Sequence, residues 1–218
     1  MKLYFAPGTC AIGIHVLMEE MGLTYEVQKV DFAANEQSGD AFLSLNPKGK
    51  VPVLLRDDGS LLTEFQAIAV WLARTFPDMN LFPDDPEMQA RILEVMDYVV
   101  GTVHMQGFSR IMRPGGFSPN QTDHESVRAR GLEIFNKGLS QLDRQMTQRT
   151  HVVDSLSIAD TALFYVEFWA VERLGQPLPP NLAEHYERMV PRAAVQRALT
   201  ANGYDLRSLR AAEVVLRP

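Results

Sequence analysis

The apolar and polar positions in the first third of the chain follow two different periods. Residues 2–5 form a short apolar run that stops at Pro7, which predicts a strand followed by a turn. Apolar side chains then recur three and four residues apart up to Gly22, a residue type that commonly ends helices. Residues 25–30 alternate apolar and polar side chains, which predicts a second strand. The chain is therefore expected to begin strand, helix, strand.

A turn at residues 46–54, reading NPKGKVPVL, precedes the next apolar run. Pro47, Gly49 and Pro52 exclude a regular helix or a central strand here. Val51 stands before a proline and is therefore expected to be extended. Such a turn can present backbone N–H and C=O groups to a ligand, although most turns of this composition only reverse the chain. Both interpretations stay open at this point.

The remaining apolar pattern of this part completes a small sheet and adds a helix. Residues 53–56 predict a buried strand, residues 57–60 a hairpin turn, and residues 61–62 a brief strand. Thr63, with Gln66 three positions later, has the form of a capping box and predicts a helix. With a weakly helical stretch before the proline-rich turn, the order becomes β-α-β-α-β-β-α. The expected buried face of the last helix comprises Phe65, Ile68, Ala69, Leu72 and Phe76.

The pattern becomes purely helical in the second part of the chain. A long amphipathic helix is expected first, and the Pro/Gly-rich residues 113–120 interrupt it with a loop. A second amphipathic helix follows, and Ser157 to Asp160 predicts the capping box of a third. Prolines near residue 180 break the chain before two shorter helices.

This change of pattern predicts two domains. The expected fold class is α/β followed by all-α, with a small mixed sheet and its helices in residues 1–78. Residues 79–86 are polar and rich in proline, and are expected to link the two domains. Residues 87–218 are expected to form an all-helical domain. A chain of 218 residues with 46% hydrophobic and 22% charged side chains has the composition of an ordinary globular protein.

Charge and cysteine content narrow the classes of function. A net charge of −6 without a basic stripe argues against nucleic acid as a partner. No apolar run approaches the roughly 20 residues that a membrane span needs, and no signal peptide is visible, so no membrane partner is expected. Cys10, the single cysteine, excludes an internal disulfide and favours a cytoplasmic location. Four-ligand zinc sites usually contain several cysteines, so no metal ligands are expected.

These motifs together resemble those of the glutathione S-transferase family. The order of elements, the turn ending in Val51 and Pro52, and the pair Thr63 and Glu64 before a helix are similar to its thioredoxin-like domain. Cys10 at the start of the first helix resembles the bacterial beta class in particular. The resemblance implies that Pro52 is cis and that the backbone of Val51 pairs with the cysteinyl part of glutathione.

The helical part resembles the second domain of the same family. Ser157-Ile158-Ala159-Asp160 is similar to the family's buried N-capping box, which is a structural motif. The glycine that usually precedes this box is missing, since residues 151–154 read HVVD. The resemblance covers roughly residues 1–200.

Cys10 is the first candidate for chemistry. A helix N-terminus carries partial positive charge, which favours the thiolate form and makes a cysteine a better nucleophile. The alternative is a small buried hydrophobic residue, as most lone cysteines are. A disulfide with glutathione is part of what the beta-class resemblance implies. The hydroxyl of Thr9 has two expected roles, contact with the same sulfur or, preferably, the N-cap of the helix.

Glu64 and Phe65 are the next candidates, because the resemblance places the γ-glutamyl end of glutathione at this helix start. Glu64 matches the family's acidic residue and would face the ammonium group of the ligand. Phe65 departs from the small polar residue usual there, so we expect glutathione binding weaker by one hydrogen bond, on the order of 1–3 kcal/mol. Its backbone N–H at a helix N-terminus remains available to an anion. Phe65 also fits the apolar core face.

The candidates in the helical part rest mainly on the resemblance. His104 is expected to approach the glutathione sulfur, or else to be a helix residue without a role. Asp97 is expected to reach the glutathione ammonium across a dimer interface, or else to be a surface carboxylate. The apolar side chains of Met105, Phe108 and Met112 are expected to line a pocket for the second substrate, or else to belong to the core.

The resulting prediction is a glutathione S-transferase that conjugates the glutathione thiol to a small apolar electrophile, by orientation and electrostatics. Glutathione is the cosubstrate, no permanently bound cofactor or metal is expected, and the resemblance implies a homodimer. One alternative is a glutathione-dependent thiol–disulfide oxidoreductase or reductive dehalogenase with Cys10 as the nucleophile. Another is a binding or interaction protein without catalytic activity.

Overall fold

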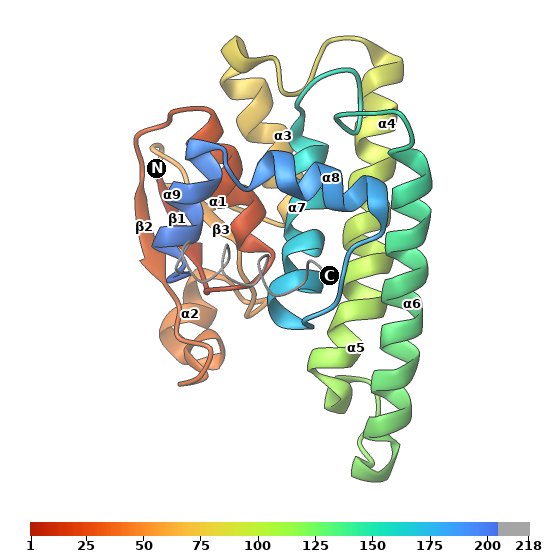
Figure 1. Ribbon diagram of the computed structural model, residues 1–218. Helices are drawn as coiled ribbons and strands as arrows, with labels where there is room; N and C mark the ends of the chain where they lie inside the picture. The colour runs from red at the N-terminus through yellow and green to blue at the C-terminus, as the bar shows by residue number, and fades with distance from the viewer. Residues whose placement is uncertain (205–218) are drawn as a thin grey trace. The chain divides into compact units, whose positions relative to one another are not determined.

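The computed structural model describes residues 1–204, and its internal contacts divide the chain into two compact units. The first unit comprises Met1–Met79 together with the segment from Arg188 on, and the second comprises Asn80–Glu187. Figure 1 shows the elements of both, and each unit is described by itself. Among the described residues, no helix combines the length and the apolar character that crossing a bilayer requires.

The first unit is built on a four-stranded mixed sheet, as the alternating pattern predicted. Its strand order is β2-β1-β3-β4, with β1 parallel to β2 and antiparallel to β3, and β3 antiparallel to β4. In the register Leu3 lies opposite Val27 on one side and Leu54 on the other. All four residues of β2 are exposed, which fits an edge strand with polar side chains. The strands are β1 Lys2–Phe5, β2 Glu26–Lys29, β3 Val53–Leu55 and β4 Leu61–Thr63.

The helices of this unit connect and cover the strands in the predicted order β-α-β-α-β-β-α. Helix α1 packs against β1 and α3, and its residues up to Met18 are buried. Gly22, with φ +62°, follows α1 in the left-handed conformation that glycine adopts without steric cost. The arrangement is the expected thioredoxin-like fold. The helices are α1 Ala11–Glu20, η1 Glu36–Ser38, α2 Asp40–Leu45, α3 Phe65–Thr75 and η2 Pro77–Met79.

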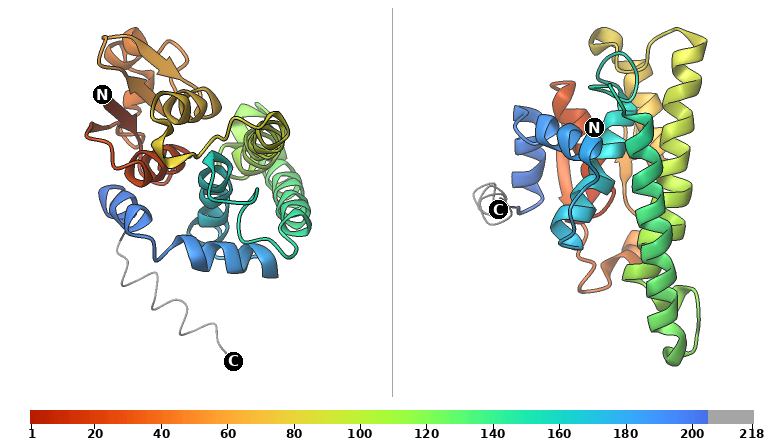
Figure 2. Two further views of the ribbon diagram at one scale, coloured as in Figure 1. Left: turned by 90° about the horizontal axis from the view of Figure 1, so that it is seen from above. Right: turned by 45° about the vertical axis from the view of Figure 1, so that its right-hand side comes forward.

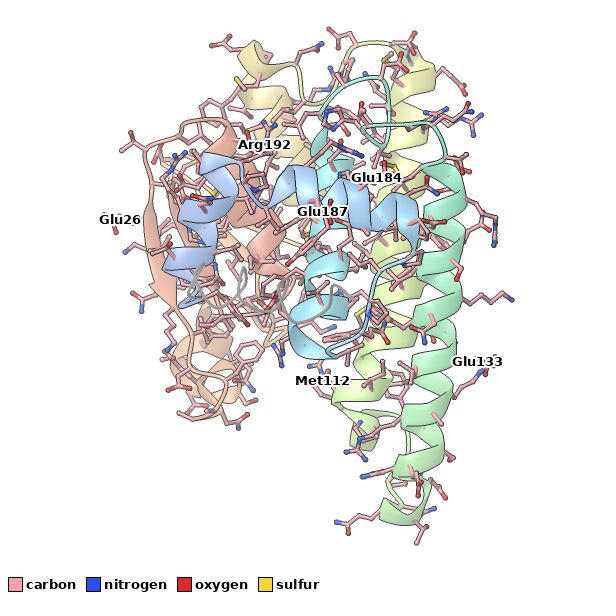
Figure 3. All side chains as sticks on the ribbon, in the orientation of Figure 1. Glu26, Met112, Glu133, Glu184, Glu187 and Arg192 are labelled. Atoms are coloured by element: carbon pink, nitrogen blue, oxygen red, sulfur yellow. The ribbon has the colours of Figure 1, made fainter. Side chains whose placement is uncertain are left out.

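Helix α9, Ala193–Ala201, also belongs to the first unit, where it lies beside α1 (Figure 1). Just before α9, the guanidinium of Arg192, labelled in Figure 3, donates to Glu20 with an Nη2–Oε2 distance of 2.9 Å. Just after α9, Asn202 donates to the Nδ1 of buried His15 at 3.2 Å. The second unit ends at Glu187 instead of running to residue 218, because these contacts tie the last described helix to α1. Residues 205–218 of the expected helical domain lie outside the described residues.

The second unit contains two long helical segments that run side by side (Figure 2). The first consists of α4, Pro86–Asp97, then η3, Tyr98–Phe108, which has π-helical hydrogen bonding, and then α5, Ser109–Met112. The second is α6, His124–Gln145, joined to the first through η4, Pro114–Gly116, and η5, Gln121–Asp123. A Cβ atom added to Gly138 on α6 would lie 2.6 Å from a methyl carbon of Val103. The two backbones therefore approach closely because α6 has no side chain at that position.

Helix α7, Ile158–Phe168, forms the core of this unit, and all eleven of its residues are buried. The predicted capping box is confirmed, since Ser157 and Asp160 bond reciprocally at its start. The helix continues as η6, Trp169–Arg173, and α8, Pro180–Met189, follows. The predicted buried positions Phe135, Leu139, Leu142 and Met146 of the second amphipathic helix region are buried as well.

Candidate active site

Cys10 stands at the junction between the strand β1 and the helix α1. The chain leaves β1 and turns at Gly8, which has φ +68°, and Cys10 is the N-cap of α1. Its thiol makes no capping hydrogen bond at the start of α1. The Sγ atom donates to the carbonyl oxygen of Val51 at 3.8 Å, and Cys10 is 9% exposed. The only cysteine is therefore aimed at the proline-containing turn.

Thr9 takes neither of its two expected roles. The N-cap of α1 is Cys10, and the hydroxyl of Thr9 donates to the carbonyl oxygen of Ala6 at 2.7 Å. Since a hydroxyl carries one proton, Thr9 cannot donate to the neighbouring sulfur at the same time. Its side chain closes the turn that leads into α1.

The turn that carries Val51 is fixed from inside by Asn46, which is 2% exposed. The amide Nδ2 of Asn46 donates to the carbonyl oxygen of Lys50 at 2.7 Å, and its Oδ1 accepts from the backbone of Lys48 at 3.2 Å. Gly49 adopts φ +60° within the turn. The peptide bond between Val51 and Pro52 is cis, as the family resemblance implied. The turn thus has a defined conformation at the edge of β3.

Glu64 begins α3 in an unusual backbone conformation. It is the N-cap with φ 75° and ψ 130°, a region that residues other than glycine rarely adopt. Strained residues of this kind often mark ligand sites. The predicted capping box of Thr63 and Gln66 is wrong, because Thr63 ends β4 and no side chain caps the helix. The Nζ atom of Lys48 donates to Glu64 at 2.7 Å and to the hydroxyl of Thr63 at 2.9 Å.

Phe65 lies in the core of the first unit. It is the first residue of α3 and is 4% exposed, and Ile68, Ala69 and Leu72 on the same helix face are also buried. This agrees with the core interpretation of its side chain. The backbone of Phe65 still belongs to the first turn of α3, where N–H groups have no acceptor within the helix and the dipole favours an anion.

These residues form one connected set of contacts in the first unit. The sulfur of Cys10 touches the carbonyl of Val51, and the same turn carries Lys48, which holds Glu64 at the start of α3. The set offers a thiol, a backbone carbonyl group in the proline-containing turn, a carboxylate and a helix N-terminus. Those groups suit a peptide-like ligand that has its own thiol, an ammonium group and a carboxylate.

His104 lies in the π-helical segment η3 of the second unit, among aromatic side chains of α7 and η6. Its Nδ1 is 3.5 Å from the hydroxyl of Tyr165, and its ring meets that of Trp169 edge-on at 4.7 Å between centroids. Helical segments with π hydrogen bonding are rare and often mark functional positions. The structure therefore fixes the orientation of this imidazole within the second unit.

The other candidates of the second unit differ in their environment. Asp97, the last residue of α4, is exposed. Phe108 is buried, and its ring stacks on Trp169 at 4.0 Å, so it is a core residue. Met105 is half-buried and accepts a hydrogen bond from Ser109, whereas Met112 is 42% exposed at the end of the long helical segment (Figure 3). The three predicted pocket residues therefore do not share one environment.

Sequence reasoning missed three participants in these arrangements. Lys48 was part of the proline-rich turn, but nothing in the pattern showed that it would reach Glu64. Tyr165 and Trp169 were identified only as buried positions of a helix, because their rings meet His104 through the tertiary fold. The sequence offered one indication of the role of Lys48, namely a charged side chain in a short turn that contains glycine and proline.

The mixed sheet, the cysteine at the first helix and the cis-proline turn define a thioredoxin-like thiol site followed by a helical unit. A protein-family sequence model described as the N-terminal domain of glutathione S-transferase matches residues 8–75. Glutathione S-transferase GstA of Escherichia coli O157:H7 is 32% identical over 93% of this chain and 99% of its own length. The chain belongs to the glutathione S-transferase family.

Solved structures agree with this assignment. A glutathione transferase homologue from Sulfitobacter with bound glutathione has a TM-score of 0.85 at 29% identity, covering 94% of this chain and 98% of its own. The bacterial beta-class enzyme of Sphingomonas chungbukensis has a TM-score of 0.81 at 30% identity, covering 94% of this chain and all of its own, 100%. The function of the chain is that of a glutathione transferase, with glutathione as cosubstrate.

Proposed function

We propose that the first unit binds glutathione through Val51, Glu64 and the N-terminus of α3. The backbone of Val51, beside the cis Pro52, pairs with the cysteinyl part of the tripeptide. The carboxylate of Glu64 receives the γ-glutamyl ammonium group, and the first N–H groups of α3, including that of Phe65, receive the γ-glutamyl carboxylate. The contact between Cys10 and the Val51 carbonyl carries the proposal, because it brings the protein's thiol to the turn where the ligand's cysteine would pair.

In the proposed reaction the thiolate of glutathione attacks an electrophilic carbon of a small apolar substrate. A carbon–sulfur bond forms, the leaving group departs with the bonding electrons, and the thiol proton goes to solvent. The protein contributes orientation of the sulfur and stabilisation of its negative charge, for which the positive end of α1 is available beside Cys10. Thr9 supports this arrangement indirectly, by closing the turn before Cys10.

In the second unit, His104 is the proposed catalytic residue and Asp97 a proposed ligand to the glutathione ammonium. The contacts of His104 with Tyr165 and Trp169 support the first assignment, since they hold the imidazole in one orientation. Met105, Phe108 and Met112 are proposed to bound the apolar pocket for the electrophile. Buried Phe108 would form the floor of this pocket, and exposed Met112 would lie at its rim.

A homodimer and a cytoplasmic role in detoxification complete the proposal. The first unit carries a shallow apolar hollow on α3 and β4, which a second copy of the chain would cover. Its lining residues are Leu62, Gln66, Ala67, Val70, Trp71 and Arg74. A reducing compartment such as the cytoplasm keeps both Cys10 and glutathione in the thiol form that the reaction needs.

The test combines binding, conjugation and mass spectrometry on the wild type and on Cys10→Ala. We expect calorimetry to show glutathione binding in both, and conjugation to an activated aryl halide to persist in Cys10→Ala. Oxidised glutathione should add one glutathione to the wild type and none to the variant. Absence of binding at about millimolar glutathione would contradict the proposal. Thiol–disulfide exchange that is lost in Cys10→Ala, together with absence of conjugation in the wild type, would instead identify Cys10 as the nucleophile of an oxidoreductase.

A further inference from the structure

Four titratable side chains meet in the interior of the second unit, outside the proposed glutathione site. Asp160 and Glu167 come from α7, His185 from α8, and His151 from the connection between α6 and α7. Asp160, Glu167 and His185 are 0% exposed, whereas the side chain of His151 is 24% exposed. Buried ionisable groups are costly unless they are paired or hold an ion, so this cluster needs a physical explanation.

Two imidazole nitrogens point at a single carboxylate oxygen in this cluster. The Oδ1 atom of Asp160 lies 3.2 Å from Nε2 of His185 and 3.3 Å from Nδ1 of His151. All three atoms lie within 4.8 Å of one another. In a tetrahedral zinc site with bonds of about 2.0 Å, neighbouring ligand atoms are about 3.3 Å apart. Two of the three separations therefore already match those of a metal site.

The other ring nitrogen of His185 is held as metal-binding histidines usually are. Its Nδ1 lies 2.8 Å and 3.0 Å from the two carboxylate oxygens of Glu167. When Nδ1–H donates to this carboxylate, the lone pair of Nε2 faces Asp160. A carboxylate behind a histidine fixes the tautomer and orientation of the ring and strengthens it as a ligand.

His151 supplies the third donor and a route from solvent. Its Nδ1 is buried and has no hydrogen-bond partner of acceptable geometry among the described residues, although it lies near Asp160. An unsatisfied buried nitrogen that points at a carboxylate oxygen is expected where a cation completes the site. Since the rest of the ring is partly exposed, an ion can enter beside it, and a water molecule can occupy the fourth position.

We infer that His151, Asp160 and His185 bind one divalent transition-metal ion of the Zn²⁺ type, with Glu167 orienting His185. Two imidazoles and one carboxylate suit Zn²⁺ and Co²⁺ and disfavour Mg²⁺ or Ca²⁺, which take oxygen ligands. The ion would join the connection after α6 to α7 and α8, so its role is to stabilise the second unit.

Metal binding requires the Nε2 atom of His185 to be free of its proton, because the lone pair of that atom is the ligand. Binding should therefore be measured above neutral pH.

The test is a titration of chelator-treated full-length protein with Co²⁺ and Zn²⁺ at about pH 8, without glutathione. We expect one ion per chain by calorimetry, together with a tetrahedral Co²⁺ absorption spectrum that lacks thiolate charge-transfer bands. His151→Ala should weaken binding by about tenfold or more. This residue is partly exposed and is not part of the capping box, so the variant should remain folded, which circular dichroism checks.

Two controls separate this site from other metal-binding groups. His124→Ala removes a half-buried histidine elsewhere in the unit, and Cys10→Ser removes the only thiol; both should bind Zn²⁺ as the wild type does. In addition, Zn²⁺ should raise the Tm of the wild type and leave that of His151→Ala almost unchanged. Equal Zn²⁺ affinity in the wild type and in His151→Ala would overturn the proposal, as would absence of saturable binding in the wild type. The cluster would then be an ion-pair network held by a proton.

Discussion

The ammonium group of Lys48 lies 2.7 Å from a carboxylate oxygen of Glu64, and this contact joins the proline-rich turn to the start of α3. Both side chains are more than half exposed, at 51% and 60%, so the pair contributes little to stability. Its consequence is orientation. Lys48 holds the carboxylate of a residue whose backbone is already in a strained conformation, and in the proposed site this would orient the carboxylate toward the γ-glutamyl ammonium group.

Glu64→Gln should therefore reduce glutathione affinity without lowering Tm. Loss of one charge-assisted hydrogen bond, about 1.5–3 kcal/mol, corresponds to about a 10–150-fold increase in Kd. Calorimetry with glutathione measures this. Glu26→Gln is the matched control, because Glu26 is an exposed glutamate on β2 that also pairs with a lysine, Lys2. An affinity unchanged in Glu64→Gln would remove Glu64 from the proposed site.

Phe65→Ser tests whether the missing hydroxyl or the aromatic core matters at the start of α3. Because Phe65 is 4% exposed, we expect the substitution to destabilise the protein by about 3–5 kcal/mol, as large-to-small core changes do. Glutathione affinity should not improve. The measurements are denaturant unfolding and calorimetry at low temperature. Phe65→Leu serves as the control with a smaller loss. A tighter glutathione complex in Phe65→Ser would show that the serine hydroxyl does reach the ligand.

Gly138→Ala should destabilise the protein because the two long helical segments of the second unit touch at this position. The added Cβ would lie 2.6 Å from a methyl carbon of Val103, so the two helical segments would have to move apart. This displacement should lower the free energy of unfolding by about 1–3 kcal/mol. Gly101→Ala is the matched control on η3, where an added Cβ has nothing within 4 Å. That variant should be neutral or stabilised by about 0.5–1 kcal/mol. Thermal unfolding of both variants decides, and similar Tm values would contradict the close contact.

Acid should destabilise the first unit through His15, a buried residue of α1 that accepts a hydrogen bond from Asn202 just after α9. Burial lowers the pKa of His15 below its usual 6.5, and Glu19 opposes this only in part. Because the unfolded chain takes up the proton more readily, the contribution of neutral His15 is present above pH 6.5 and is lost as the pH falls. His15→Gln should accordingly flatten the loss of stability between about pH 7.5 and pH 5. An identical slope in the wild type and in His15→Gln would exclude His15 as its source.

Most of the fold followed from periodicity, whereas several local contacts did not. The alternating and helical patterns placed the strands, α1, α3 and the helices of the second unit, because each element buries one face. The start of α3 was predicted wrongly. Thr63 and Gln66 have the spacing of a capping box, and this local pattern placed the N-cap at Thr63. The fold instead places Thr63 in β4 and forces Glu64 into a positive φ. A tertiary constraint overrode the local preference there.

The proposed glutathione site and the proposed metal site differ in the same way: the first has local marks in the sequence, and the second depends on the tertiary fold. Cys10 and Val51 were identified because a turn, a helix start and a family resemblance mark them in the sequence. The spacing of His151, Asp160 and His185 along the sequence matches no short metal-binding motif. Their side chains come together only through the packing of α7 and α8. Helical spacing around Phe108 could not show which of its apolar neighbours face the core.

The first unit is discontinuous, because α9 packs on α1 after the whole second unit has been traversed. During synthesis on the ribosome, β1 to α3 emerge first, yet the surface of α1 near His15 stays open until residues 193–202 are made. The N-terminal part of the protein is therefore the last to complete its core, contrary to the usual order in which domains fold as they emerge. A fragment that stops after Met79 would lack this cover, and adding α9 in trans should restore it.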